Sequence, residues 1–308
     1  MRRGITGLIV AAVALSAAGC GGSAVHERPA ARTTAALSPS PSASPTDGNG
    51  SLVPSNLDIP TAGPHAKGAV VGADVSWPQC PKGMGIPQKR SEGLPMPTGS
   101  ARFVILGLTN GPSFVANPCL ADQVAWVRSR HLWAGAYSVI SYPDAKTLAQ
   151  VADKGPYDGG TPAGALSNAG YQAALFNAAT MKRVGLLPPF VWIDVEHVPH
   201  FEWSNDTGAN AAVLRGAVRG YESQGFGVGL YSVPSLWASV VGDLALRLPE
   251  WRAAGHTSAV EARNRCESSA WSFGGGPGVI GQWVDGSRDL NLTCSAAGDD
   301  LARWFRKF

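Results

Sequence analysis

The sequence predicts an α/β fold, a single TIM-like β/α barrel that occupies residues 68–308. Short apolar runs rich in β-branched residues alternate in this region with longer stretches that carry apolar residues at helical spacing. Near-continuous apolar strands favour parallel pairing with both faces covered, and about 240 residues suit one large barrel. A doubly wound open sheet is the alternative, because not all the strands are legible. For the same reason the expectation includes an irregular barrel.

Six short apolar runs are the expected strands, at residues 69–75, 103–108, 135–141, 190–196, 227–232 and 279–283. The expected helices lie at residues 119–131, 169–184, 209–224 and 260–269. In the first of them Leu120, Val124 and Val127 share one face. Residues 244–256 fit neither pattern clearly, because Pro249 interrupts the run. Barrels carry their functional side chains at the carboxyl ends of the strands, which directs the search for a site.

The N-terminal segment has the order of a secretory signal peptide. Arg2 and Arg3 precede an apolar run at residues 8–18, with small residues before Cys20. This run is shorter than the roughly 20 residues that cross a bilayer. Cleavage before Cys20 would resemble bacterial lipoprotein processing, so residues 1–20 are predicted to be a lipoprotein signal peptide with Cys20 as the lipidation site. An ordinary signal peptide cut elsewhere is the alternative.

Residues 21–67 are dominated by Ser, Pro, Thr, Ala and Gly and show no apolar periodicity. Such a composition cannot bury enough apolar surface to fold, so a disordered linker is predicted. A flexible coil of about 47 residues has an end-to-end distance of roughly 35–40 Å, enough to hold a domain away from a membrane. The chain is therefore expected to be exported and to work as a lipoprotein at the outer face of the cytoplasmic membrane or in the cell wall.

The charge balance argues against a nucleic-acid partner. The chain has 25 Lys and Arg against 22 Asp and Glu, and two of the arginines lie in the predicted signal peptide. Duplex binding calls for clustered cations that displace counterions from phosphates. The one such group in the sequence is the short tail Arg303, Arg306 and Lys307, which is more typical of a solvated helix face. A monomer that needs no cofactor is expected.

Four cysteines lie in the predicted domain: Cys80, Cys119, Cys266 and Cys294. An even number in an oxidising compartment predicts two disulfides, for which three pairings exist. The pairing Cys80–Cys119 and Cys266–Cys294 is favoured, because each bond would join neighbouring segments and add about 3–4 kcal/mol in the chain-entropy model. A metal site built from all four cysteines is disfavoured, since no Cys-x-x-Cys motif occurs.

Acidic residues stand at expected strand ends, although Asp and Glu are poor strand residues. These are Asp74, the pair Asp194 and Glu196, and Asp289. Residues two apart on a strand point to one face, so Asp194 and Glu196 would enter one pocket about 7 Å apart along the backbone. Two close carboxylates cannot both ionise freely, which raises the pKa of one of them. A protonated acid beside an ionised carboxylate is what glycosidic cleavage requires.

Two other interpretations of the acidic pair stay open. Asp194 and Glu196 could form a solvated strand end or an ion pair with an arginine. They could also hold a divalent ion together with His197 and His200. The metal interpretation is disfavoured, because His197 would face away from Glu196 on a continued strand and Pro199 indicates a loop. No metal is therefore expected.

Six short motifs in the domain resemble the family 25 glycoside hydrolases, the lysozyme-type muramidases of bacteria and phages. They follow one another in the family's order: Asp-Val-Ser at 74–76, Phe-Val-Ile at 103–105, Gly-Ala-Tyr at 135–137, Ile-Asp-Val-Glu at 193–196, Gly-Leu-Tyr at 229–231 and Asp-Leu-Asn at 289–291. Each motif is short. Their joint order across nearly the whole domain carries the resemblance.

The resemblance implies a β/α barrel that cleaves the β-1,4 bond between N-acetylmuramic acid and N-acetylglucosamine in peptidoglycan. On the matching positions, Glu196 would protonate the leaving group, and Asp194 would stabilise the transition state or the substrate's acetamido group. Asp74 and Asp289 would complete the acidic floor. The expected partners are peptidoglycan or a related cell-wall glycan, and the membrane through the N-terminal lipid.

The residues expected to contact sugar are aromatic: Tyr137, Tyr231 and Trp283, whose faces would pack on sugar rings. Their motifs depart from the family's pattern. Ser138 follows Gly-Ala-Tyr where the family has His, and Trp283 ends a Gly-Gln-Trp where the family has Trp-Gln-Tyr. Two functions are therefore carried forward: a membrane-tethered cell-wall glycoside hydrolase and, as the alternative, a non-catalytic glycan-binding or wall-organising lipoprotein on the same barrel.

Overall fold

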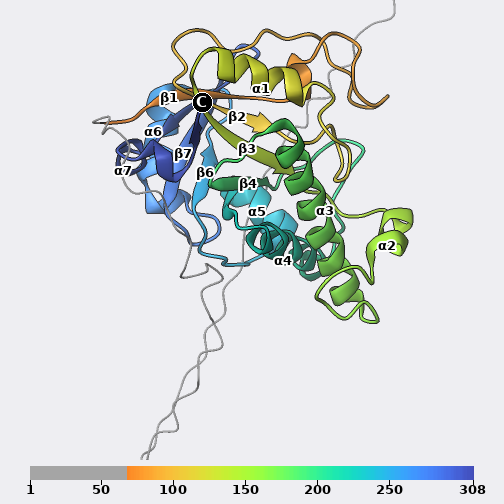
Figure 1. Cartoon of the computed structure of the whole chain (residues 1–308). Coiled ribbons are helices and arrows are strands. Elements are labelled where there is room, and N and C mark those ends of the chain that lie inside the picture. The colour runs from red at the N-terminus through yellow and green to blue at the C-terminus, as the bar shows by residue number, and fades with distance from the viewer. Residues whose placement is uncertain (1–67) are drawn as a thin grey trace, which may run out of the picture. The chain divides into compact units, whose positions relative to one another are not determined.

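The apolar runs pair edge to edge into a closed barrel within residues 68–308, the part of the chain that the structure, a computed structural model, describes (Figure 1). Strands β1 to β8 follow one another around the barrel, and the pairing of β2 with β3 and of β1 with β8 closes it. The strands are β1 (Val71–Val75), β2 (Phe103–Gly107), β3 (Trp133–Val139), β4 (Phe190–Asp194), β5 (Gly227–Ser232), β6 (Glu250–Ala253), β7 (Gly278–Asp285), β8 (Arg288–Thr293) and a short β9 (Arg306–Lys307). The prediction of an α/β barrel is confirmed.

Helices connect the strands and cover the outside of the barrel. They are α1 (Leu120–Ser129), α2 (Ala145–Val151), α3 (Pro162–Val184), α4 (Thr207–Ser223), α5 (Pro234–Val241), α6 (Ala259–Glu267) and α7 (Ser295–Gly298), with short 3-10 turns η1 (Trp77–Gln79), η2 (Ser269–Trp271) and η3 (Leu301–Arg303). The sequence missed α2 and α5. It also placed the start of α3 too late, because that helix begins at Pro162, where Thr161 caps it by accepting a hydrogen bond from the Gly164 N–H.

The barrel is irregular at β8. β1 to β7 run parallel to their neighbours in sequence, whereas β8 pairs antiparallel with both β7 and β1. A tight turn joins β7 to β8, and Gly286 in this turn has a φ of 62°, which glycine adopts without strain. Because β8 is reversed, its first residues lie where the other strands have their carboxyl ends.

The stretch that the sequence left unclear contains β6. This strand pairs with β5 and β7 and so completes the barrel. Pro249 does not interrupt it, because Pro249 lies one residue before the strand and its carbonyl accepts the Leu230 N–H at 2.9 Å. A proline at that place costs no ladder hydrogen bond.

Aromatic side chains fill the amino end of the barrel interior. Phe305 stacks on Phe103 with ring centroids 4.5 Å apart, and Trp304 packs on Phe190 at 4.8 Å. The segment that carries them ends in β9, which pairs antiparallel with β3. The C-terminal end, marked in Figure 1, thus lies beside β2 and β3. The interior is therefore closed at its amino end, which leaves the carboxyl end for a cavity.

Both favoured disulfides are present. Cys80 pairs with Cys119 and Cys266 pairs with Cys294, each with 5.5 Å between the Cα atoms. The first bond joins the turn after β1 to the start of α1, and the second joins the end of α6 to the end of β8. The predicted pairing is confirmed.

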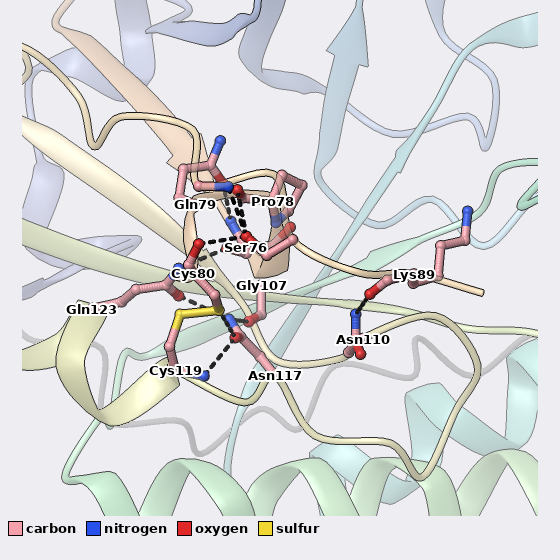
Figure 2. Close-up of a disulfide and its surroundings, with 12 residues drawn as sticks. Ser76, Pro78, Gln79, Cys80, Lys89, Gly107, Asn110, Asn117, Cys119 and Gln123 are labelled. Atoms are coloured by element: carbon pink, nitrogen blue, oxygen red, sulfur yellow. Dashed lines mark hydrogen bonds between the residues drawn. A yellow bond between two sulfur atoms is a disulfide. The ribbon is translucent and has the colours of Figure 1, made fainter. Parts of the chain in front are cut away.

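The segment around the first disulfide is tied to the barrel by hydrogen bonds (Figure 2). The Asn117 side chain donates to the Gly107 carbonyl at 2.8 Å, and Gln123 donates to the Ser76 carbonyl at 2.6 Å. The loop that follows Cys80 is tied as well, because the Asn110 amide donates to the Lys89 carbonyl at 3.0 Å. These contacts hold Lys89 near the carboxyl end of the barrel.

The predicted signal peptide, the lipidation site Cys20 and the predicted linker lie outside the described residues. Within residues 68–308 no helix is long and apolar enough to cross a membrane.

Candidate active site

A cavity of about 290 Å³ lies at the carboxyl end of the barrel strands. Four carboxylates that the sequence singles out line it: Asp74, Asp194, Glu196 and Asp289. The two predicted tyrosines, Tyr137 and Tyr231, line it as well. Strands β1, β3, β4, β5 and β8 each contribute at least one of these residues or carry it just past their end.

The strand pattern explains how the acids meet. Asp194 ends β4 and Glu196 follows two residues later, so strand alternation turns both into the cavity. Ile193 and Val195 point the other way, into the core between the sheet and the helices. Asp289 reaches the same place because β8 runs antiparallel and carries it near its start.

Asp74 is held by two amide side chains. Its Oδ1 accepts a hydrogen bond from Gln282 Nε2 at 2.9 Å and another from Asn291 Nδ2 at 2.6 Å. Burial raises the pKa of Asp74 well above its usual value, and the charge of Asp289 raises it further, while the two amide hydrogen bonds act in the opposite direction. Asp74 therefore keeps its proton to higher pH than an exposed aspartate, although its two donors favour the ionised form.

The two amides are themselves oriented by aromatic donors. Tyr231 donates its hydroxyl to Gln282 Oε1 at 2.8 Å, and Trp251 donates its indole N–H to Asn291 Oδ1 at 2.8 Å. Since each amide oxygen is occupied by a donor, each amide N–H₂ is directed at Asp74. This chain of hydrogen bonds fixes the floor of the cavity.

Asp194 is buried, and its Oδ1 has no hydrogen-bond partner within the described residues. Burial raises the pKa of Asp194 well above the usual value, and the nearby charges of Glu196 and Asp74 add to the shift. A buried carboxyl without a donor is costly to ionise, so Asp194 holds a proton over a wider pH range than an exposed aspartate.

Glu196 and Asp289 are less enclosed. Burial is the main cause that raises the pKa of Glu196, the charge of Asp289 adds to it, and Lys89 acts against it. Burial also raises the pKa of Asp289, whereas His256 lowers it. The side chain of Glu196 stays partly exposed, so of the Asp194 and Glu196 pair it is the one open to a substrate.

No lysine or arginine forms an ion pair with these acids in residues 68–308, where the ion pairs are Arg252–Glu250 and Arg265–Glu261. The ionisation of each acid therefore depends on the others, because ionising one raises the cost of ionising the next. Such a group can donate a proton to a leaving oxygen and can also stabilise positive charge.

The aromatic residues that the sequence singles out separate into two places. Tyr137 and Tyr231 both pack edge-on against Trp251, at 5.7 and 4.7 Å between ring centroids. Trp283 does not line the cavity, because it packs with Leu292 in a buried cluster around the second disulfide. Gln282, its neighbour on β7, lines the cavity in its place.

Gln282, Asn291 and Trp251 were not singled out as functional from the sequence. Strand alternation could have found Gln282, since residues 282 and 283 must face opposite sides of β7. Asn291 is two residues after Asp289 on β8 and so shares its face. Trp251 was missed because Pro249 obscured the strand that carries it.

The alternative in which the acidic pair binds a metal gains no support from the geometry. Within residues 68–308 no group of three or more His, Cys, Asp or Glu side chains is placed to hold a metal ion. His197 is exposed, and its Nε2 lies 3.3 Å from the Ser239 hydroxyl.

A larger cavity, of about 490 Å³, lies among the loops that follow β2, β3 and β4. Its carboxylates differ from those of the smaller cavity. Asp144 accepts the Thr147 N–H and Glu202 accepts the His200 N–H, and these hydrogen bonds lower the pKa of both acids. Ionised carboxylates that accept backbone hydrogen bonds are poor proton donors, so the smaller cavity is the candidate active site.

Comparisons with known proteins were made at three levels. No protein-family model matches the chain, and no curated protein matches it. Solved structures do resemble it. A bacterial lysozyme from Streptomyces coelicolor is 15% identical with a TM-score of 0.48, and the match covers 76% of this chain and 96% of that one. A family GH25 lysozyme from Aspergillus fumigatus is 12% identical with a TM-score of 0.43, over 73% of this chain and 93% of that one.

A third structure is the modular autolysin LytC from Streptococcus pneumoniae in complex with a synthetic peptidoglycan ligand. It is 12% identical with a TM-score of 0.41, and the match covers 73% of this chain but 46% of LytC. The chain thus spans less than half of LytC. The similarity to lysozymes and autolysins is at low identity and low TM-score, so the function has to be inferred from the site itself.

Proposed function

We propose that this chain is a cell-wall glycoside hydrolase that cleaves β-1,4-glycosidic bonds of peptidoglycan, in the manner of a muramidase. The observation that carries the proposal is the group of four carboxylates around one cavity, each with a raised pKa. Glycosidic cleavage needs one carboxyl that keeps its proton and another that carries negative charge. Neighbouring acids whose ionisation is interdependent can supply both.

Glu196 is the general acid in this proposal. It is the partly exposed member of the pair, so it can reach the oxygen of a bound glycosidic bond. Its raised pKa keeps the proton available in mildly acidic solution. As Glu196 gives its proton to the leaving oxygen, Asp194 in its ionised form stabilises the positive charge that develops at the anomeric carbon. Water then attacks this carbon, and its proton returns to Glu196.

Asp74 and the two tyrosines position the sugar. The hydrogen bonds from Gln282 and Asn291 fix the Asp74 carboxyl in one orientation, and a fixed acceptor directs a sugar hydroxyl or acetamido N–H better than a mobile one. Tyr137 and Tyr231 present ring surface beside it, on which a pyranose ring can pack.

The test uses the chain from residue 21 onward and purified peptidoglycan at mildly acidic pH, with new reducing ends as the measurement. We expect release by the wild type and a rate lower by about 10²- to 10⁴-fold for Glu196→Gln, since general acid catalysis contributes that much. Glu222→Gln is the matched control. Burial raises the pKa of Glu222 to about 7, but this residue lies on α4 and does not line the cavity, so its variant should keep the wild-type rate.

A non-catalytic glycan-binding or wall-organising protein is the second candidate, and the position of Trp283 favours it, because an expected sugar contact is missing from the cavity. Two other observations favour the hydrolase. Glu196 has no ion pair with an arginine in the described residues, and no residue of 145–168 fills the cavity. Wall binding by wild type and Glu196→Gln alike, without reducing ends from either, would establish the binding protein instead.

The place of action follows from the two disulfides, which form and persist in oxidising compartments outside the cytoplasm. We infer that the chain is exported and anchored through a lipid on Cys20. Mass spectrometry of the N-terminal peptide checks this: the wild type should carry the diacylglycerol mass, and Cys20→Ala should lose both this mass and membrane association.

A further inference from the structure

Eight exposed cations gather at the amino end of the barrel, opposite the carboxylate cavity. We call this group the basic face; it consists of Arg102, Arg128, Arg130, Lys182, Arg183, Arg303, Arg306 and Lys307. The cations come from four segments that are distant in sequence, residues 97–103, 124–134, 180–187 and 303–308. None of these segments contains an Asp or a Glu.

Backbone pairing brings the first of these segments together. The Trp133 N–H donates to the Arg102 carbonyl at 3.2 Å, where β2 and β3 begin. Lys307 of β9 pairs with Trp133 of β3, and its ammonium lies 5.7 Å from the Trp133 ring centroid. Arg102, Lys307 and the start of β3 are therefore neighbours.

Stacking on an aromatic ring brings two further cations of the basic face together. The guanidinium groups of Arg128 and Arg306 lie 4.9 and 5.4 Å from the Phe308 ring centroid. A Cβ at Gly185, which follows α3, would lie 3.1 Å from an Arg128 nitrogen, so the end of α3 with Lys182 adjoins the group. The rings hold the arginine stems while the charged heads stay in solvent.

The charges of the basic face are not neutralised by the described part of the chain. The ion pairs within residues 68–308 use Arg252 and Arg265, which are outside the basic face. Asp299 and Asp300 border it on the side of α7, which packs on β7 and β8. The described segments of the basic face near β2, β3 and β9 contain no Asp or Glu side chain.

A cavity of about 290 Å³ lies beside Arg130 of the basic face. Its lining includes Trp126, Arg130, Leu132 and Ala101. The guanidinium of Arg130 stacks 4.2 Å over the Trp126 ring centroid at this cavity. A guanidinium held in place beside apolar surface fits a phosphate group that is attached to an apolar body.

We propose that the basic face docks on an anionic phospholipid surface, with a lipid phosphate in the cavity beside Trp126 and Arg130. Clustered Lys and Arg with interleaved aromatic residues are the composition that recognises anionic lipid headgroups. The place where the preceding residues enter the barrel favours a membrane lipid as the source of the phosphate. Residue 68 lies three residues before β1, whose start is at this same end of the barrel, and it adjoins Gly298 there. The preceding residues therefore join the barrel at the end that carries the basic face.

Docking in this orientation turns the carboxylate cavity away from the membrane. The tethered domain would then rest on the lipid with its candidate active site directed at the wall. This inference does not depend on the proposed hydrolysis, because lipid binding is measured without substrate.

The experiment is sedimentation with vesicles, using the chain from residue 21 onward, which lacks Cys20, so that no acyl chain contributes. The vesicles are phosphatidylcholine alone or phosphatidylcholine with phosphatidylglycerol. The variant is Arg102→Gln, Arg130→Gln and Arg306→Gln combined. The matched control replaces three exposed arginines elsewhere, Arg215, Arg219 and Arg263, by Gln, and so has the same net charge.

We expect binding to the anionic vesicles alone, and weaker binding at high salt. Each charge near the surface is worth about fivefold, so the triple variant should bind about 100-fold more weakly while the control binds like the wild type. The thermal unfolding midpoints of both variants show that each is folded. Equal binding by both variants overturns the proposal. So does binding to soluble polyglycerol phosphate in preference to vesicles, because it would assign the basic face to a polymer of the wall.

Discussion

The barrel buries carboxylates in two places, and their surroundings differ in kind. At the cavity, Asp194 has a carboxyl oxygen without a partner, and no cation is bonded to any of the four acids within the described residues. On β6, Glu250 is fully buried and lies 2.8 Å from the guanidinium of Arg252, which is 4% exposed. Both places hold acids on or next to barrel strands, but of these acids Glu250 alone forms an ion pair with a cation.

The pair on β6 organises the loop that follows α6. Glu250 Oε1 accepts the backbone N–H groups of Gly274 and Gly276 at 2.8 and 3.0 Å. Arg252 in turn donates to the carbonyls of Cys266 and Ser268, at 3.1 and 2.7 Å. The charged atoms of both side chains thus have partners at the end of α6 or in the loop that follows it. A buried ion pair satisfied in this way holds one conformation, whereas acids left with raised pKa values keep protons for chemistry.

The largest loss of stability is expected when Glu250 can no longer balance the charge of Arg252. Glu250→Gln leaves the Arg252 charge buried without its carboxylate and turns an amide N–H₂ toward a guanidinium. We expect a loss of about 3–5 kcal/mol in the free energy of unfolding, as for other buried pairs that lose one partner. Urea unfolding followed by tryptophan fluorescence measures it. A loss below about 1 kcal/mol would show that the pair is not the device that holds residues 268–276 in place.

The sequence could not predict this pair. Pro249, Glu250 and Trp251 interrupt the apolar pattern, because proline and charged residues are poor strand formers. The strand forms nevertheless, since partners 13 to 26 residues further along the chain satisfy both charges. Apolar runs and helical spacing are local signals, and they were sufficient for the other parallel strands. A strand stabilised by distant partners leaves no local signal.

The same chemical change at the cavity should have the opposite sign. Asp194→Asn removes an ionisable group that is buried without a donor, so we expect the variant to be more stable than the wild type at pH 7, where ionisation of the buried carboxyl is costly. Wall hydrolysis should fall at the same time, because sites tuned for activity are often costly to stability. Thermal unfolding and reducing-end release on one preparation measure both.

The pH dependence sharpens this prediction. The pKa of Asp194 is raised in the folded state, so between the unfolded value of about 4 and the folded value the native chain binds more protons than the unfolded chain. Wild-type stability therefore decreases as the pH increases through that window. The advantage of Asp194→Asn should be present at pH 7 and shrink as the pH is lowered to about 4. An advantage of the same size at both pH values would mean that packing, not ionisation, is its cause.

The candidate site was more predictable than the β6 pair because its signals lie at strand ends. Asp74, Asp194 and Glu196 could be placed from strand alternation and from the rule that barrel strands deliver their carboxyl ends to one site. Trp283 was assigned by motif, and the structure turns it into the cluster around the second disulfide. The basic face could not be seen at all, because its eight cations come from four separate segments that folding alone brings together.

The smallest effect is expected at a pair with the same geometry but little burial. On α6, Arg265 Nε lies 2.8 Å from Glu261 Oε1, the same separation as in the β6 pair, but the two side chains are 19% and 37% exposed. Glu261→Gln should cost at most about 0.5 kcal/mol, because solvent screens such pairs and an i,i+4 contact contributes little. Glu261 also lies in the first turn of its helix, where losing a negative charge adds a few tenths of a kcal/mol. When both variants are unfolded in urea, the loss of stability should be several-fold larger for Glu250→Gln than for Glu261→Gln. Similar losses would show that distance, and not burial, determines what a carboxylate contributes to this barrel.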